Sequence, residues 1–303
     1  MTSARPLLSG LLLVFAITGG QAQAQQTPSP GEALRQQYAA MARDPAASAL
    51  ADRRLYLRSS AQGDRLLGEV IAVIDQPYGL VRRTLVDPDA WCGILILHLN
   101  VHYCRASGPP GRPVLDTGMG RKTGEPLDEL YWLSFHHRVL RNGDDHVAVS
   151  LQAPTGPLDT RDYDVRVEAA PHVAGQTLLN LRYGYRHGLT ARLAMSTYLA
   201  TLGAGKVGFS SVGRRDNGQP IRVGGLRGVL ERNTMRYHLA IEAYLGALGA
   251  PPAQQQRKSL LDWYLATERY PQQLHEIDRE AYLDLKLRAI ARQETESPPV
   301  QRH

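Results

Sequence analysis

The sequence contains very little cysteine, with Cys92 and Cys104 as its only two cysteines in 303 residues. An isolated close pair in an exported chain indicates a disulfide rather than redox chemistry or a metal site. No Gly-x-Ser-x-Gly motif occurs, so a common serine-nucleophile signature is absent, and bonded cysteines leave no free thiol for catalysis. The sequence therefore provides no evident catalytic motif.

Lysine is scarce beside arginine, and no basic tract interleaved with aromatic residues is present. The formal charge of +6 therefore suits an anionic cell envelope better than nucleic acid. A solvated basic surface without any partner is the simpler explanation of the same charge. We expect no nucleic-acid partner.

Long apolar runs are also absent, since the longest candidate is the short core of residues 7–17. That core is well below the roughly 20 residues that a membrane span needs. It follows Arg5 and precedes Ala22-Gln23-Ala24, the small-x-small pattern of a signal-peptidase site. We predict a signal peptide over residues 1–24, secretion into a bacterial periplasm, and no membrane span after cleavage.

The two cysteines restrict the shape of the apolar run between them. Across the twelve intervening steps, a strand would separate their Cα atoms by about 40 Å and a helix by about 18 Å. A disulfide tolerates only about 4.4–6.8 Å. The run must therefore reverse direction between Cys92 and Cys104.

The hydropathy pattern predicts a mixed α+β protein. After a flexible or helical segment (25–54) that includes a short helix at 31–43, the pattern predicts a buried strand at 68–75 and a helix at 78–86. The Gly/Pro-rich stretch 107–126 indicates a loop or an irregular hairpin. Four antiparallel strands with one wet face follow, at 130–140, 146–152, 162–168 and around 179–185.

Helices dominate the last third of the sequence. We expect a helix at 189–202, a short strand at 206–211, and a long amphipathic helix at 226–248 that keeps Glu231 and Arg232 off its apolar stripe. Two further helices, at 256–269 and 271–293, are separated by Pro271. They lie in a C-terminal extension over 251–303 that ends in a polar tail.

The histidines suggest two alternatives. His98, His102 and Cys104 combine imidazole and thiolate, which suits zinc, but a disulfide would consume Cys104, and a packed histidine beside a disulfide is the favoured interpretation. His136 and His137 are adjacent in a strand, so their rings point to opposite faces and cannot share a metal. We expect no metal or other cofactor.

Three stretches resemble the START-like helix-grip superfamily. Residues 68–77 with the following helix are similar to its first strand and helix, residues 87–91 to its turn before a tryptophan, and residues 225–230 to the start of its long helix. The resemblance covers about residues 55–250. It implies a curved antiparallel sheet wrapped around a long C-terminal helix, with a hydrophobic cavity between them.

This resemblance implies a binding protein for a lipid or other hydrophobic small molecule. Sparse polar groups within an apolar lining would orient the ligand, although plain core tyrosines are an equal alternative. The candidate lining residues are His137, Tyr183, Tyr185, Asn233, Tyr237 and Tyr244. Two other hypotheses are a hydrolase- or cyclase-like enzyme in the same cavity and an envelope protein that binds a partner through its C-terminal helices.

Overall fold

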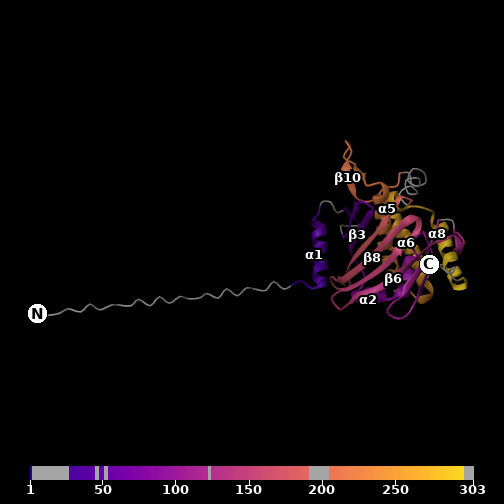
Figure 1. Ribbon diagram of the computed structural model, residues 1–303, viewed down its shortest axis with the longest axis horizontal. Helices are drawn as coiled ribbons and strands as arrows, with labels where there is room; N and C mark the ends of the chain where they lie inside the picture. Colours follow the sequence, from indigo (N-terminus) through magenta and orange to yellow (C-terminus); the bar gives the residue numbers. More distant parts are fainter. Residues whose placement is uncertain (2–26, 45–47, 51–53, 122–123, 191–204, 297–303) are drawn as a thin grey trace.

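The computed structural model describes residues 1, 27–44, 48–50, 54–121, 124–190 and 205–296 (Figure 1). The predicted signal peptide and nearly all of the predicted helix 189–202 lie outside the described residues. None of the helices in the described part of the chain has the length and hydropathy of a membrane span.

Within the described residues, nine strands form one antiparallel sheet in the order β1-β2-β3-β9-β8-β7-β6-β5-β4. The tyrosine-bearing strand β9 therefore lies between β3 and β8, and β4 forms one edge. The strands are β1 (Ser48–Leu50), β2 (Leu55–Gln62), β3 (Arg65–Ile74), β4 (Val101–Ser107), β5 (Val114–Met119), β6 (Tyr131–Asn142), β7 (Val147–Thr155), β8 (Thr160–Pro171) and β9 (Thr177–His187).

Three helices cover the inner face of this sheet, namely α2 (Tyr78–Val86), α3 (Pro88–Leu95) and the 23-residue α5 (Gly225–Ala247). The strands alternate as expected, since Tyr163, Val165 and Val167 of β8 all point into the main hydrophobic core. Helix α5 packs against β2, β3 and β9. The α+β class, with an antiparallel sheet packed around a long helix, is confirmed.

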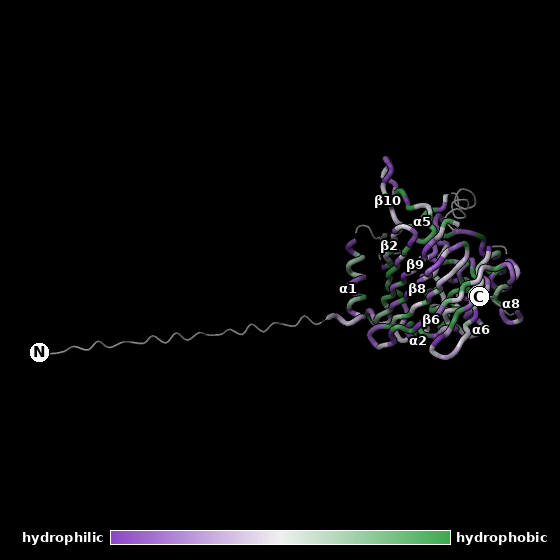
Figure 2. Tube along the Cα trace, viewed as in Figure 1, coloured by the Kyte–Doolittle hydropathy of each residue, from purple (hydrophilic) through white to green (hydrophobic). Residues whose placement is uncertain are grey.

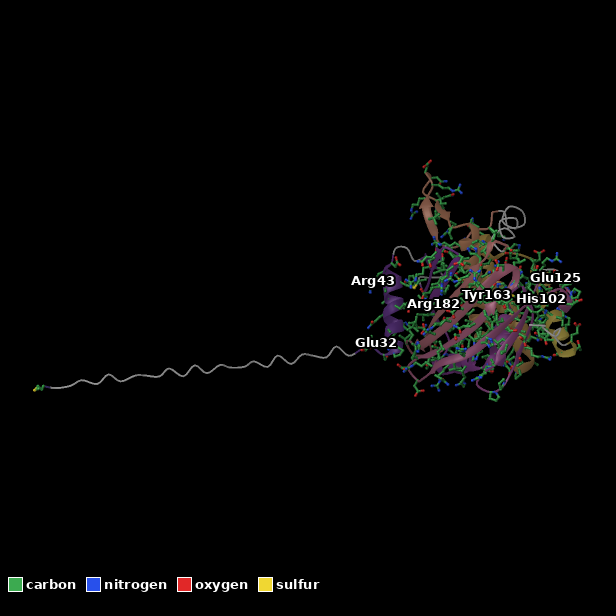
Figure 3. The ribbon with its side chains drawn as sticks, viewed as in Figure 1. Glu32, Arg43, His102, Glu125, Tyr163 and Arg182 are labelled. Atoms are coloured by element: carbon green, nitrogen blue, oxygen red, sulfur yellow. A yellow bond between two sulfur atoms is a disulfide. The ribbon has the colours of Figure 1, made fainter. Side chains whose placement is uncertain are left out.

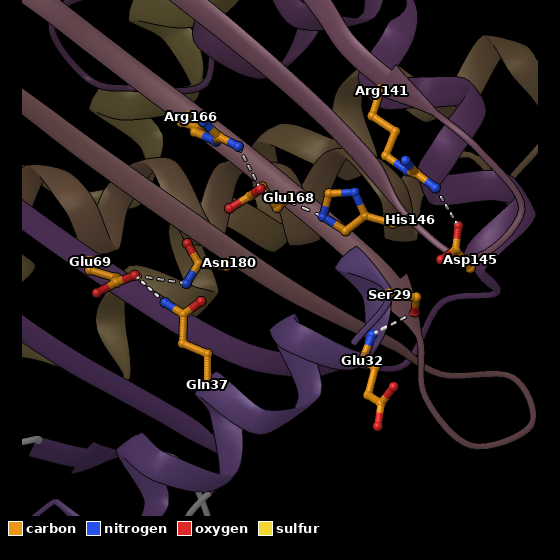
Figure 4. Close-up of polar contacts among 10 residues, drawn as sticks. All are labelled: Ser29, Glu32, Gln37, Glu69, Arg141, Asp145, His146, Arg166, Glu168 and Asn180. Atoms are coloured by element: carbon orange, nitrogen blue, oxygen red, sulfur yellow. Dashed lines mark hydrogen bonds and ion pairs between the residues drawn. The ribbon is translucent and has the colours of Figure 1, made fainter. Parts of the chain in front are cut away.

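The outer face of the sheet is not exposed to solvent everywhere, because α1 (Pro30–Arg43) packs on β8 and β9. Leu34 and Met41 of α1 form a second apolar cluster with the sheet. Beneath the helix, the buried Glu69 carboxylate accepts hydrogen bonds from Gln37 Nε2 at 2.7 Å and Asn180 Nδ2 at 2.9 Å (Figure 4). The prediction of one solvent-exposed sheet face is wrong beneath α1, where a helix covers it.

The C-terminal helices pack back onto the domain. Helix α6 (Pro252–Glu268) lies against α5, and after the short α7 (Pro271–Leu274) helix α8 (Arg279–Thr295) packs along β4. Cys104 N donates to Gln293 Oε1 at 2.5 Å, and Lys286 Nζ donates to Val101 O at 2.6 Å. The region 271–293 was predicted as one helix, but it contains two, α7 and α8. The boundary at residue 250 stays a prediction, although α6 and α8 both contribute to the main core.

The stretch 107–126 holds a strand that the sequence analysis assigned to a loop or irregular hairpin. Its strand β5 pairs with both β4 and β6. The glycine- and proline-rich residues before it form only the turn. The 3₁₀ turns η1 (Leu127–Glu129) and η2 (Pro157–Asp159) connect strands further along the sheet.

A two-stranded hairpin of β10 (Ser211–Arg214) and β11 (Pro220–Arg222) precedes α5. The prediction of a strand at 206–211 is wrong, because β10 begins only at Ser211. In the residues before it, the Glu231 carboxylate accepts hydrogen bonds from Phe209 N at 2.6 Å and Ser210 N at 2.8 Å. Glu231 and Arg232 are themselves buried. Their predicted exposure is also wrong, since the segment before α5 packs against this part of the helix.

Candidate functional site

A pocket of about 340 Å³ opens beside the N-terminal half of α5, and we call it the α5 pocket. Six parts of the chain line it: the turn between α3 and β4, the end of β5 with the residues after it, the start of β6, the η2 turn, α5 itself, and the segment between α7 and α8. Its lining includes His98, Met119, Leu158, Val229, Asn233 and Arg236. Charged side chains share this lining with the apolar ones, since Arg121, Arg232 and Glu276 also belong to it. Polar groups within partly apolar walls are typical of small-molecule sites.

His98 is the most distinctive group in this pocket. Its side chain is only 3% exposed, yet just one of its two ring nitrogens has a hydrogen-bond partner in good geometry. Its Nδ1 accepts a hydrogen bond from Asn100 N at 3.2 Å. A neutral imidazole that accepts at Nδ1 carries its proton on Nε2. Nε2 has no partner that meets strict hydrogen-bond geometry among the described residues, although the Asn233 side chain lies close enough to raise the pKa of the ring as a hydrogen-bond partner. His98 therefore holds a buried N–H donor without a well-placed acceptor at the edge of the pocket.

Burial keeps His98 neutral near pH 7, and nearby positive charges reinforce this effect. Burial, followed by the positive charges of Arg236 and Lys286, lowers the pKa of His98 well below its usual value, and the Asn233 side chain opposes this shift. Lys286 Nζ also donates to His98 O at 2.5 Å, which fixes the turn that carries the imidazole.

Asn233 is oriented by a buried ion pair. Arg236 binds Glu276 at 2.7 Å, and both side chains are more than nine-tenths buried. Arg236 also donates to Asn233 Oδ1 at 3.2 Å. Arg236 therefore holds the amide oxygen of Asn233, and both residues line the pocket. The polar wall thus favours a ligand that accepts hydrogen bonds.

A series of stacked and tilted rings lies behind His98. The His98 ring stacks on Tyr237 with centroids 4.9 Å apart, and Tyr237 meets Tyr183 edge-on at 5.3 Å. Tyr185 and Tyr163 continue the series, with their rings stacked at 5.3 Å (Tyr163 is labelled in Figure 3). Burial raises the pKa of Tyr183, Tyr185 and Tyr237, so their hydroxyls stay protonated. These rings occupy space between β9 and α5 where the resemblance implied a cavity.

The structure brings four of the six predicted lining residues together. Asn233 lines the α5 pocket, and Tyr237, Tyr183 and Tyr185 form the ring series behind it. Their role in holding a ligand stays a prediction. None of the three tyrosines is among the residues that line this pocket.

His137 and Tyr244 lie elsewhere. His137 is buried, with Nε2 3.3 Å from Leu85 O, a carbonyl that also accepts from Trp91 Nε1 at 2.7 Å. Its neighbour His136 is exposed, so the two rings do point to opposite faces. Tyr244 lines a second pocket of about 340 Å³, where its ring lies against Gly93.

The predicted disulfide joins Cys92 in α3 to Cys104 in β4, with Cα atoms 5.1 Å apart. The intervening run ends a helix, turns and enters a strand, so the predicted reversal is confirmed. The bond also leaves no thiolate for a metal. His102, labelled in Figure 3, contacts Arg121 O through Nε2 at 2.7 Å. In the described part of the chain, no group of three or more histidine, cysteine or acidic side chains is placed to hold a metal ion.

Sequence reasoning missed several residues of the α5 pocket. His98 was considered only as a metal ligand or packed histidine, and Met119, Leu158 and Arg236 were not considered. Leu158 and Asp159 have positive φ values of 54° and 60° in the η2 turn, a conformation that non-glycine residues adopt rarely. No local sequence signal marks these positions, because they meet only through the tertiary fold.

Several solved structures are similar to this chain. A protein from Thermus thermophilus matches it with a TM-score of 0.40 and 11% identity, over 60% of this chain and 98% of its own. Human StAR-related lipid transfer protein 5 has a TM-score of 0.36 and 12% identity, over 56% and 87%. The Zhui aromatase/cyclase from Streptomyces has a TM-score of 0.32 and 14% identity, over 77% and 96%.

The chain has a helix-grip fold. Its own strand order and the position of α5 carry that conclusion, and the START-like resemblance is confirmed at the level of fold. The likeness to the solved structures carries no argument about function. No protein-family model matches the chain, and no curated protein matches its sequence.

Proposed function

We propose that this protein is an exported binding protein that holds a small hydrophobic molecule in the α5 pocket. The observation that carries the proposal is the buried, neutral His98, a residue of the pocket lining whose Nε2–H has no acceptor in good hydrogen-bond geometry. A buried donor that lacks a partner costs about 1–3 kcal/mol. A ligand oxygen placed there would recover that free energy.

The pocket also limits the kind of ligand. Met119, Leu158 and Val229 supply apolar walls, while Asn233 and Arg236 add polar groups to the lining. A volume of about 340 Å³ is at the low end of the range for small-molecule sites. These features support a compact apolar molecule with a carbonyl, ether or hydroxyl oxygen at one end.

Export is part of the same proposal. Disulfides persist in oxidising compartments, and the Cys92–Cys104 bond supports such a location. The signal-peptide pattern over residues 1–24 supports it independently.

The test is native mass spectrometry of the protein purified from its own cell envelope, followed by organic extraction of the bound material. We expect an adduct that is lost in Asn233→Leu, since that change removes a polar group from the α5 pocket. The matched control Gln256→Leu alters the second pocket, beside the disulfide, and should keep the adduct.

Two results would overturn this proposal. One is an adduct-free protein that also gives no thermal shift with a broad panel of hydrophobic molecules. The other is an adduct that survives in Asn233→Leu but disappears in Gln256→Leu, which would place the ligand beside the disulfide.

An enzyme in the same fold is the second candidate. General acid–base groups work best when their pKa is near the working pH. Burial lowers the pKa of both His98 and His137, which favours a hydrogen-bonding role over proton transfer. Chemical conversion of the extracted molecule on incubation with the protein would favour an enzyme over a binding protein.

A further inference from the structure

The hairpin β10–β11 projects from the body of the molecule beside the start of α5 (Figures 1 and 2). Every residue from Ser211 to Ile221 is exposed. Neither the ligand-binding proposal nor the core accounts for this projection. The inference below does not rest on the proposed ligand.

The base of the hairpin is firmly held. Phe209 is 1% exposed and meets Tyr270 edge-on at 5.4 Å, and Glu231 binds the backbone of Phe209 and Ser210. Gly208 N donates to Val223 O at 2.7 Å, which closes the base from the other side. The exposed strands are therefore presented from a rigid base.

The hairpin combines two exposed β-branched apolar side chains with a surplus of positive charge. Val212 is 58% exposed and Ile221 is 40% exposed. Arg214, Arg215 and Arg222 oppose a single acidic residue, Asp216. Apolar side chains flanked by arginine are the composition of segments that lie at an anionic bilayer interface.

We infer that the β10–β11 hairpin docks the protein on an anionic lipid surface. Arg214 and Arg215 would contact headgroup phosphates, and Val212 and Ile221 would enter the upper interface. Arg222 donates to Phe209 O at the base of the hairpin. A lipid surface fits better than a protein partner, because a stable protein interface buries about 800 Å² on each side. Strands of four and three residues offer less than that.

The experiment is flotation of the purified full chain with vesicles of pure phosphatidylglycerol or pure phosphatidylcholine. We expect binding to phosphatidylglycerol only. The variant R214Q/R215Q should reduce the partition coefficient about 25-fold, since each arginine near such a surface contributes about 5-fold. The variant V212S/I221S should also bind more weakly.

Matched controls use exposed residues elsewhere on the molecule. Arg138→Gln lies on β6, and Val173→Ser, at a valine that is 59% exposed, lies in the turn between β8 and β9. Both should bind like the unmodified protein. The inference is overturned if phosphatidylglycerol is not bound, if the controls lose as much binding as the hairpin variants, or if the hairpin instead mediates self-association in sedimentation experiments.

Discussion

At the scale of single residues, Glu231 connects three separate parts of the chain. Its fully buried carboxylate accepts the N–H groups of Phe209 and Ser210 and the hydroxyl of Ser59. These bonds link the segment before α5 and strand β2 to α5 itself. A carboxylate with this many donors has no close substitute.

We predict that Glu231→Gln lowers the free energy of unfolding by about 3 kcal/mol, because a buried charge-assisted network is replaced by a single acceptor. Urea denaturation measures this loss. Glu280→Gln, at a side chain that is 78% exposed, should change stability by less than about 0.5 kcal/mol. Equal losses in the two variants would contradict the prediction.

His102 gives a residue-scale prediction about pH. Burial, followed by the charge of Lys286, lowers the pKa of His102 to about 4, whereas the unfolded chain keeps about 6.5. The unfolded state therefore binds more protons between these values, and stability falls as the pH drops from about 6.5 to 4.

Urea denaturation at pH 7.0 and pH 4.5 tests this dependence. The stability difference between the two pH values should be smaller in His102→Gln than in the unmodified protein, by about 2 kcal/mol. His136→Gln, at an exposed histidine, should keep the full difference. An unchanged difference in His102→Gln would show that His102 is not responsible.

At the scale of elements, the disulfide and α8 both secure the edge strand β4. The disulfide ties β4 to α3. Helix α8 binds β4 through Gln293 and Lys286, and Tyr282 donates to Leu97 O at 2.9 Å in the turn between α3 and β4. An uncovered edge strand is an aggregation hazard, so these contacts also protect the sheet.

Reduction of the disulfide should destabilise the fold by about 3 kcal/mol, the chain-entropy value for a loop of this length. Thermal unfolding with and without a reducing agent measures the effect. The C92S/C104S variant should reproduce the reduced protein and respond no further to the reducing agent. A stability independent of reduction would mean that α8 holds β4 without help from the bond.

Truncation after Ala250 should yield an aggregating protein, because it removes α6 and α8 from the core and uncovers β4. Size-exclusion chromatography and circular dichroism check this outcome. Truncation after Thr295, the last residue of α8, should leave a folded monomer. A folded monomer from the shorter chain would instead support a separable C-terminal extension that is free to bind a partner.

At the scale of the whole molecule, the candidate ligand site joins parts of the chain that are far apart in sequence. His98, Leu158, Asn233 and Glu276 come together around one end of α5. A ligand that binds only this assembled state stabilises it by mass action.

We therefore predict that removal of the co-purifying molecule lowers the Tm by several degrees and that adding back the extract restores it. Differential scanning calorimetry measures both steps. Asn233→Leu should not respond to the extract, whereas Gln256→Leu should respond like the unmodified protein. A Tm that is insensitive to extraction would argue against a bound stabilising ligand.

Local patterns were sufficient for several of the regular elements. The helix at 78–86 was predicted with its bounds, and the strands around 130–140 and 162–168 were found because their burial alternates with period two. The strand β5 was missed because the glycines and prolines before it dominate its segment. The 206–211 strand was misplaced because a distant carboxylate, Glu231, binds its backbone.

The sequence by itself determined the disulfide, the forced reversal between its cysteines, the α+β class and the long helix, since each follows from spacing or periodicity within one segment. Only the tertiary structure decided that α1 shields part of the outer sheet face from solvent, that α8 covers β4, and that His137 lies away from the tyrosines. It also placed His98 at the pocket with a donor that lacks a well-placed acceptor. The physical reason is that burial and hydrogen-bond satisfaction depend on contacts between distant segments, which no local pattern encodes.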